Sequence, residues 1–147
     1  MRERDYKEFS AVSFTSDRRE LADLMAERYG ERTDVVVGCL DDYTPACVGA
    51  AIMSRPNVIT LLFFATDHFP EIALPVTRFI RKQFLPRLVH AGVHRIEAVS
   101  LAGYVETHAW LKTLGLDQET EEMRGYGKHG EAFIQFAWSR DVRPFGA

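Results

Sequence analysis

One segment constrains the fold of this chain more than any other: an unbroken apolar strand, an amphipathic helix and a second strand. Val58–Ala65 is apolar with almost no alternation, which is typical of a strand covered on both faces, so we place it at the centre of a sheet. Apolar residues then recur at three- and four-residue steps from Ile72 to Leu88, with basic residues between them, until Gly92. Residues 93–99 return as a strand. This order predicts a parallel pair joined by a right-handed crossover.

Shorter elements surround this unit. The alternation of Phe9, Val12 and Phe14 predicts a first strand. A helix follows it, a meander of short antiparallel strands precedes the central strand, and a second helix stops at Gly115 before a closing hairpin of residues 121–126 and 132–138. The sequence therefore predicts one α/β (α+β) domain over residues 1–147, with a mixed, mostly antiparallel sheet of about seven strands and about three helices.

Two prolines fall within the long helix. Pro75 is expected in its first turn, where the missing N–H costs nothing. Pro86 is expected to kink or shorten it, because a proline ring clashes with the carbonyl four residues back.

Composition excludes several classes of protein. The chain has 147 residues and a formal net charge of −3, which argues against a broad nucleic-acid-binding face. No stretch approaches the roughly 20 apolar residues of a membrane span, and the charged start is not followed by a signal region. Two cysteines are too few for a disulfide scaffold. We therefore expect a cytoplasmic protein that binds neither nucleic acid nor membrane.

The best candidate for a ligand site follows the central strand. His68, beside Asp67, lies between that strand and the N-terminus of the long helix. Ligands of α/β sheets collect at the C-terminal ends of strands, and helix N-termini attract anions through free N–H groups and the dipole. Residues 66–76 are therefore the favoured place for a phosphate-bearing ligand. The alternative is an ordinary loop in which Asp67 caps the helix.

The second helix carries two candidate acids or bases near its start. Glu106 and His108 are two residues apart and so point in different directions. Either serves as acid or base if it faces a cleft, and the alternative is that both are solvated polar positions. Trp110, at helical spacing, fits the core better than a ligand platform.

Metal chemistry has little support in the sequence. Cys39 and Cys47 flank a turn with no nearby histidine or third cysteine, so we expect buried thiols rather than a zinc site. The remaining histidines form no ligand set. The chain also lacks the Gly-x-Ser-x-Gly, Walker and His-Glu-x-x-His motifs, which removes the main support for a hydrolase or a nucleoside triphosphatase.

The second half of the chain resembles a known superfamily. The resemblance is carried by residues 95–99 (Arg-Ile-Glu-Ala-Val), residues 110–116 (Trp-Leu-Lys-Thr-Leu-Gly-Leu) and a hairpin ending at residues 133–138 (Phe-Ile-Gln-Phe-Ala-Trp). Together they resemble the GNAT acetyltransferases, and in detail the small GNAT-like proteins of tailed phages and prophages. The first half matches only in the order of its elements.

The resemblance implies a binding mode for acetyl-CoA. The two parallel strands would splay at their C-terminal ends, the pantetheine arm would lie between them, and the pyrophosphate would rest on N–H groups at the start of the long helix. The implied cofactor-binding residues are Phe63, Phe64, Ala65, Thr66, Asp67, His68, Phe69, Ile72, Val76 and Arg78. The family's glycine-containing phosphate loop is missing from this segment, which holds two prolines and Glu71 instead.

The resemblance also implies a reaction, in which a primary amine attacks the thioester directly. The family's usual tyrosine acid is replaced by Leu111, so Tyr104 or His108 is the substitute acid, and Glu106 or Asp67 a possible base or amine anchor.

Three functions follow from the resemblance. The first is an acetyl-CoA-dependent N-acetyltransferase acting on an unidentified amine. The second is a GNAT-fold protein that no longer catalyses and serves as a structural or interaction module, for example in a phage virion. The third is a regulatory domain that binds coenzyme A. A homodimer is a further possibility if Trp138 and Phe145 prove exposed.

Overall fold

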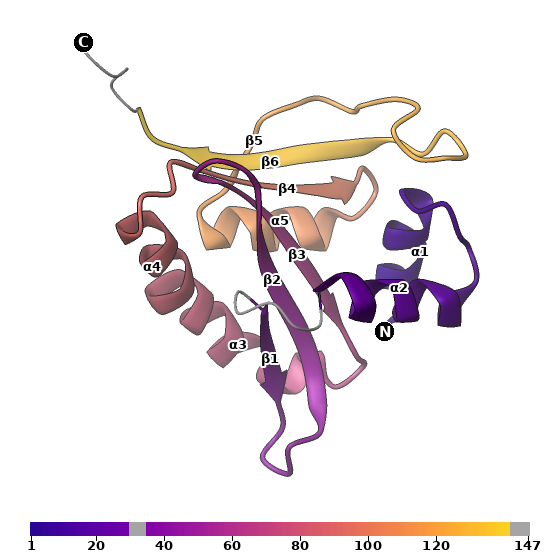
Figure 1. Cartoon of the computed structure of the whole chain (residues 1–147), viewed down its shortest axis with the longest axis horizontal. Helices are drawn as coiled ribbons and strands as arrows, with labels where there is room; N and C mark the ends of the chain where they lie inside the picture. Colours follow the sequence, from indigo (N-terminus) through magenta and orange to yellow (C-terminus); the bar gives the residue numbers. More distant parts are fainter. Residues whose placement is uncertain (30–34, 142–147) are drawn as a thin grey trace.

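The computed structural model describes residues 1–29 and 35–141 (Figure 1). The described strands form one six-stranded sheet in the order β1-β2-β3-β4-β6-β5. They are β1 (Val35–Cys39), β2 (Pro45–Arg55), β3 (Val58–Ala65), β4 (Arg95–Leu101), β5 (Asp117–Gln118) and β6 (Phe133–Ser139). The helices are α1 (Glu3–Ala11), α2 (Arg18–Tyr29), α3 (Phe69–Phe79), the π-helical turn η1 (Ile80–Phe84), α4 (Leu85–His90) and α5 (Val105–Leu114). The predicted mixed, mostly antiparallel α/β sheet is confirmed.

The parallel pair at the centre of the sheet is also confirmed, and it is short. β3 and β4 pair only at Val58 with Arg95, Ile59 with Ile96 and Thr60 with Glu97. Both strands continue past these pairs and diverge, as Figure 1 shows. We call the gap between residues 61–65 of β3 and residues 98–101 of β4 the notch.

The long helix begins earlier than the sequence predicted. α3 starts at Phe69 with Pro70 in its first turn, so the placement of Pro75 in the first turn is wrong and Pro75 lies inside the helix. Pro86 does not end the helix. The chain widens instead into η1, where the N–H of Leu85 donates to the carbonyl of Ile80, five residues back. A π-helical turn of this kind relieves the crowding that a proline causes in a regular helix.

The predicted first strand is wrong, because residues 3–11 form α1. Acidic side chains in its first turn, Glu3 and Asp5, favour a helix through the dipole. Phe9 packs edge-on against Phe64 of β3, with ring centroids 5.7 Å apart. Phe14 is fully exposed beyond the helix end.

The closing hairpin differs as well. β5 consists of Asp117–Gln118 alone, and residues 119–132 return to β6 as a loop with one isolated bridge from Met123 to Phe133. The strand expected over residues 121–126 is therefore wrong. Gly125 has φ 70°, a left-handed conformation that turns the chain away from a ladder.

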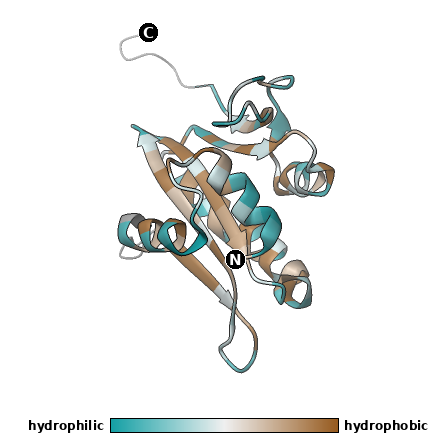
Figure 2. Cartoon of the chain, turned by 90° about the vertical axis from the view of Figure 1, so that its right-hand side faces the viewer, coloured by the Kyte–Doolittle hydropathy of each residue, from teal (hydrophilic) through white to brown (hydrophobic). Residues whose placement is uncertain are grey.

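The main core lies between the sheet and the helices α4 and α5, where Ile96, Leu111, Leu114 and Phe136 are buried together. In Figure 2 the central strands are predominantly apolar, while hydrophilic residues gather on the helices and loops. α5 ends at Gly115 with φ 107°, as predicted. No helix in the described ranges is both long and apolar enough to cross a membrane.

Candidate functional site

A cavity of about 920 Å³ opens at the notch. It extends from α1, past the diverging ends of β3 and β4, to the space beneath α3, and most of the residues that line it are apolar. Six of the residues predicted to bind the cofactor or to catalyse line it: Phe63, Phe69, Ile72, Val76, Tyr104 and Glu106. Residues 64–68, Arg78 and His108 lie outside its lining.

Three aromatic rings from three elements form one wall of the cavity. Phe63 of β3 lies 4.7 Å from Trp110 of α5 and 5.1 Å from Phe69 of α3, measured between ring centroids. The indole N–H of Trp110 donates to Thr77 Oγ1 at 2.9 Å, which fixes the ring. Trp110 is half-buried, so it packs against the core and also lines the cavity. Its helical spacing suggested only the first of these positions.

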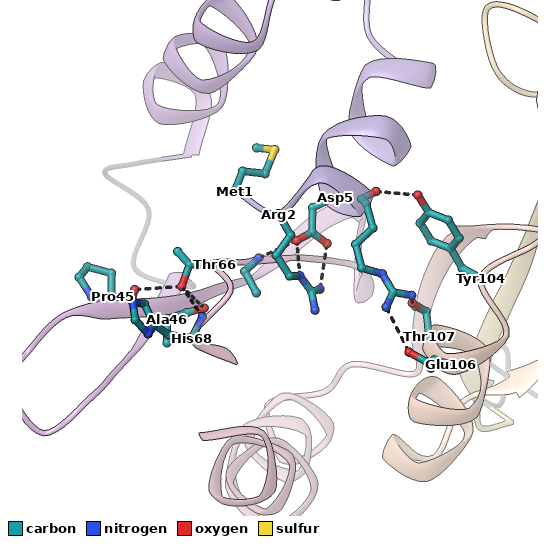
Figure 3. A network of polar contacts seen from close by, with 12 residues as sticks. Met1, Arg2, Asp5, Pro45, Ala46, Thr66, His68, Tyr104, Glu106 and Thr107 are labelled. Atoms are coloured by element: carbon teal, nitrogen blue, oxygen red, sulfur yellow. Dashed lines mark hydrogen bonds and ion pairs between the residues drawn. The ribbon is translucent and has the colours of Figure 1, made fainter. Parts of the chain in front are cut away.

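The N-terminal helix occupies one end of the notch (Figure 3). The N–H of Ala65 donates to Asp5 Oδ2 at 3.1 Å, and the N–H of Arg2 donates to the carbonyl of Ala65 at 2.7 Å. Asp5 is 7% exposed and pairs with the guanidinium of Arg2 at 2.7 Å. Both backbone groups of Ala65 are therefore held by α1.

A second carboxylate from α1 reaches the end of β4. Glu8 Oε2 accepts hydrogen bonds from the N–H of Leu101 at 3.0 Å and from Ser100 Oγ at 3.3 Å. Burial raises the pKa of Glu8, and the nearby charge of Asp5 adds to this, although the two hydrogen bonds oppose it. Glu8 therefore faces the cavity as a carboxyl group that titrates above its usual range. Nothing in the local sequence marks it, because its position depends on the docking of α1.

Arg4 covers the start of α5. Its guanidinium lies over the ring of Tyr104 at 4.9 Å and bonds Glu106 at 3.3 Å and Thr107 at 3.0 Å, while its carbonyl accepts the hydroxyl of Tyr104 at 3.0 Å. Burial raises the pKa of Tyr104, and the charge of Glu8 adds to the effect. Tyr104 is thus protonated at neutral pH and lies at the cavity, as an acid must.

His108 is not among the residues that line the cavity. Its Nε2 bonds the carbonyl of Leu101 at 2.9 Å, and its ring packs on Phe136 at 5.1 Å. The structure therefore brings Tyr104 and Glu106 together at the cavity, but not His108. Val105, the first residue of α5, is 73% exposed.

The first N–H groups of α3 already donate hydrogen bonds within the chain. Phe69 N–H donates to Thr66 O at 3.1 Å, Glu71 N–H donates to His68 O at 3.0 Å, and Pro70 has no N–H to offer. The carboxylate of Glu71 bonds His68 Nδ1 at 2.9 Å. His68 is the N-cap residue, and its side chain makes no capping hydrogen bond to the helix backbone, so the alternative in which Asp67 caps the helix is wrong. This helix start therefore offers an anion few free N–H donors, and it places the carboxylate of Glu71 nearby.

The two cysteines differ from one another. Cys47 is buried, as expected, but Cys39 is exposed, and both are free thiols. Burial raises the pKa of Cys47. Across the described residues there is no group of three or more His, Cys, Asp or Glu side chains that could hold a metal ion.

Comparison with known proteins supports the fold through structure alone. No family model matches the sequence, and no curated protein matches it. Similar solved structures include an acetyltransferase from Salmonella typhimurium with acetyl-CoA bound, with a TM-score of 0.67 and 12% identity over 90% of this chain and 81% of that one. The ribosomal-protein-S18-alanine N-acetyltransferase of Escherichia coli gives a TM-score of 0.64 and 17% identity over 85% and 80%.

A third similar structure is that of an enzyme named for a different acceptor. The spermidine N-acetyltransferase of Vibrio cholerae has a TM-score of 0.61 and 9% identity over 85% of this chain and 76% of that one. In this chain, the strand order includes one short parallel pair, and α3 lies on the crossover between its two strands. The chain therefore has the GNAT fold.

Proposed function

We propose that this chain is an acyl-CoA-dependent N-acyltransferase, with acetyl-CoA as its simplest donor. The observation that carries the proposal is the notch: β3 and β4 separate after three residue pairs, and a cavity of about 920 Å³ opens where they part. The likeness of the fold to an acetyltransferase that binds acetyl-CoA supports it.

The arm of the donor would lie along the backbone of Phe63, beside the wall that Phe69 and Trp110 form with it. Ile72 and Val76 would flank it from α3. The remaining residues implied by the resemblance follow Phe63 along the chain and stay part of the proposal: Phe64, Ala65, Thr66, Asp67 and His68, with Arg78 as a cation further along α3.

The reaction would place an amine on the α1 side of the notch. Its nitrogen would attack the thioester carbonyl, the carbon–sulfur bond would break, and the departing thiolate would take the phenolic proton of Tyr104 once that hydroxyl has left the carbonyl of Arg4. The proton lost by the amine would pass to a carboxylate at the cavity, for which Glu106 and Glu8 are the candidates. His108 and Asp67 are less suited to these roles because neither lines the cavity.

Two measurements test the proposal. The melting temperature is recorded with and without acetyl-CoA or free coenzyme A, since a ligand present at 100 times its dissociation constant stabilises a protein by about 2.7 kcal/mol. Thiol release is then followed with a set of amines that includes a polyamine and peptides with a free N-terminus. We expect stabilisation by both compounds and thiol release with at least one amine. No stabilisation by either compound would refute the proposal.

A specific observation favours a second function, that of a structural or interaction module without catalysis. The backbone groups of Ala65 and the first N–H groups of α3 are already bonded within the chain. The absence of any coenzyme A binding in the same titrations would favour this function, including the phage-particle role that the resemblance suggests. Binding without thiol release would favour a regulatory domain.

The proposed homodimer depends on residues near the C-terminus. Trp138 is half-buried and packs against the core, which weakens its part of the argument, and Phe145 lies outside the described residues. Light scattering of the purified chain would determine the oligomeric state.

A further inference from the structure

The space beneath α3 is unusually empty for a helix that packs on a sheet. The side of α3 that faces the sheet is apolar and includes Ile72, Val76 and Phe79. The structure describes every residue of this helix, and none of them is buried. A helix with an apolar face ordinarily buries that face against its neighbours. These three residues line the cavity instead, so the helix stands partly off the sheet.

Two glycines on the sheet show where the helix touches and where it does not. A Cβ atom placed on Gly38 of β1 would lie 2.6 Å from Cys47 Sγ and 3.1 Å from Ile72 Cδ1, so α3 rests on the sheet there. A Cβ atom on Gly49 of β2 would meet, among the described residues, only Leu62 O and Phe63 Cδ2, each at 4.0 Å. No side chain of α3 therefore reaches the sheet at Gly49.

This hollow is continuous with the notch. Gly49 pairs with Phe63, and both line the same cavity as Phe69 and Trp110. The charged residues of the lining lie mainly at the other end, where α1 and the start of α5 contribute Arg4, Glu8 and Glu106. The cavity thus has an apolar end beneath α3 and a charged end beneath α1.

We propose that the hollow over Gly49 receives the acyl chain of the donor, and that this chain is a linear hydrocarbon longer than acetyl. The inference rests on the proposed function and names its donor class. An acyl chain suits the apolar end because burying methylene groups is favourable, whereas an amine suits the charged end. The cavity has the size of ordinary small-molecule sites, roughly 300–1,000 Å³.

The first test compares ligands of increasing chain length on the full chain. Coenzyme A, acetyl-CoA, butanoyl-CoA and octanoyl-CoA are titrated by calorimetry. We expect the dissociation constant to fall roughly two- to fourfold for each added methylene. If acetyl-CoA and octanoyl-CoA bind equally well, the inference is wrong and the proposed function stands. If none of the four binds, the proposed function fails and the inference falls with it.

The second test fills the hollow. Gly49→Val places two methyl groups over the sheet, where the nearest atoms leave room for them. Met53→Val is the matched control, because Met53 is on the same strand, is 55% exposed and lies outside the cavity lining. Gly49→Ala fills less space and serves if the valine variant does not fold, as judged by circular dichroism.

The ratio of the acetyl-CoA to the octanoyl-CoA dissociation constant decides the outcome. We expect this ratio to fall at least tenfold in Gly49→Val, to fall less in Gly49→Ala and to stay at the wild-type value in Met53→Val. A wild-type ratio in a folded Gly49→Val protein would overturn the inference.

Discussion

The carboxylate of Asp5 accepts the N–H of Ala65 at 3.1 Å, so a residue of the first helical turn holds the end of the central strand. Ala65 is among the residues whose backbone a donor arm would use. The N-terminal helix and such an arm therefore compete for the same backbone groups.

Asp5→Ala tests this competition. Removal of the carboxylate leaves the buried N–H of Ala65 without a partner, which costs about 1–3 kcal/mol of unfolding free energy. Because α1 would then be held less firmly, we expect coenzyme A to bind more tightly than to the wild type. Urea denaturation and calorimetry measure the two effects.

The matched control is Glu3→Ala on the same helix. Glu3 is exposed and, within residues 1–29 and 35–141, pairs only with Arg18 at the surface, so we expect a loss below about 1 kcal/mol and unchanged binding. Weaker or equal binding in Asp5→Ala would show that α1 does not oppose the ligand.

The variant Glu8→Gln should differ from the wild type in the pH dependence of its stability, because it lacks the buried carboxyl group. Burial raises the pKa of Glu8 above its ordinary value of 4.5, so the native state binds a proton that the unfolded state has released. The stability linked to this proton is complete below pH 4.5 and is lost as pH rises through the native pKa. We therefore expect the wild type to lose stability relative to Glu8→Gln as pH rises from 4 to 8.

Urea denaturation of both proteins at several pH values between 4 and 8 measures that difference. The comparison cancels the titration of groups that the two proteins share. A difference that is constant with pH would mean that Glu8 titrates alike in the folded and unfolded states.

Glu119→Gln should have the opposite pH dependence. Hydrogen bonds from Arg95 and Gln135 lower the pKa of Glu119 to about 2. Its contribution is present above pH 4.5 and disappears as pH falls towards 2. Because the side chain is 38% exposed, we expect a contribution of only about 0.5–1 kcal/mol at pH 7. Denaturation at pH 7, 4 and 2 checks this, and a loss of equal size at pH 2 would contradict it.

The variants Tyr104→Phe and Trp110→Phe distinguish a residue that acts in the reaction from one that only shapes the cavity wall. General acids contribute roughly 100-fold or more to rate, so we expect Tyr104→Phe to lower kcat by about that factor. Trp110→Phe keeps an aromatic ring in the wall and loses the bond to Thr77, which should lower stability by about 1 kcal/mol with a smaller effect on kcat. Equal kcat in Tyr104→Phe and wild type, with both folded, would discard Tyr104 as the acid.

The central part of the fold could be predicted because its signals are local and strong. The unalternating run of β3 and the stop at Gly115 each follow from a few neighbouring residues. The first strand could not be predicted correctly, because Phe9 and Val12 are three apart and fit one helical face as well as an alternation. Three apolar residues are too few to distinguish the two periods.

Among the site residues too, some could be predicted from local sequence and others could not. Phe63 and Phe69 were proposed as cofactor-binding residues through the resemblance, and the structure places both at the cavity beyond the end of the central strand. Asp5 and Glu8 were not, because their roles arise only when α1 docks across the strand ends, a contact between residues 60 or more apart. Trp110 was assigned to the core because periodicity cannot distinguish a buried wall from the wall of a cavity.

The short pairing of β3 with β4 has a consequence for the whole sheet. It divides the sheet into two plates, β1-β2-β3 and β4-β6-β5, each with its own antiparallel ladder and joined by three residue pairs. Beyond these pairs the two plates are joined by α1, whose Asp5 bonds Ala65 of β3 and whose Glu8 bonds Leu101 of β4. The separation of the two strand ends at the notch is therefore tied to the docking of α1.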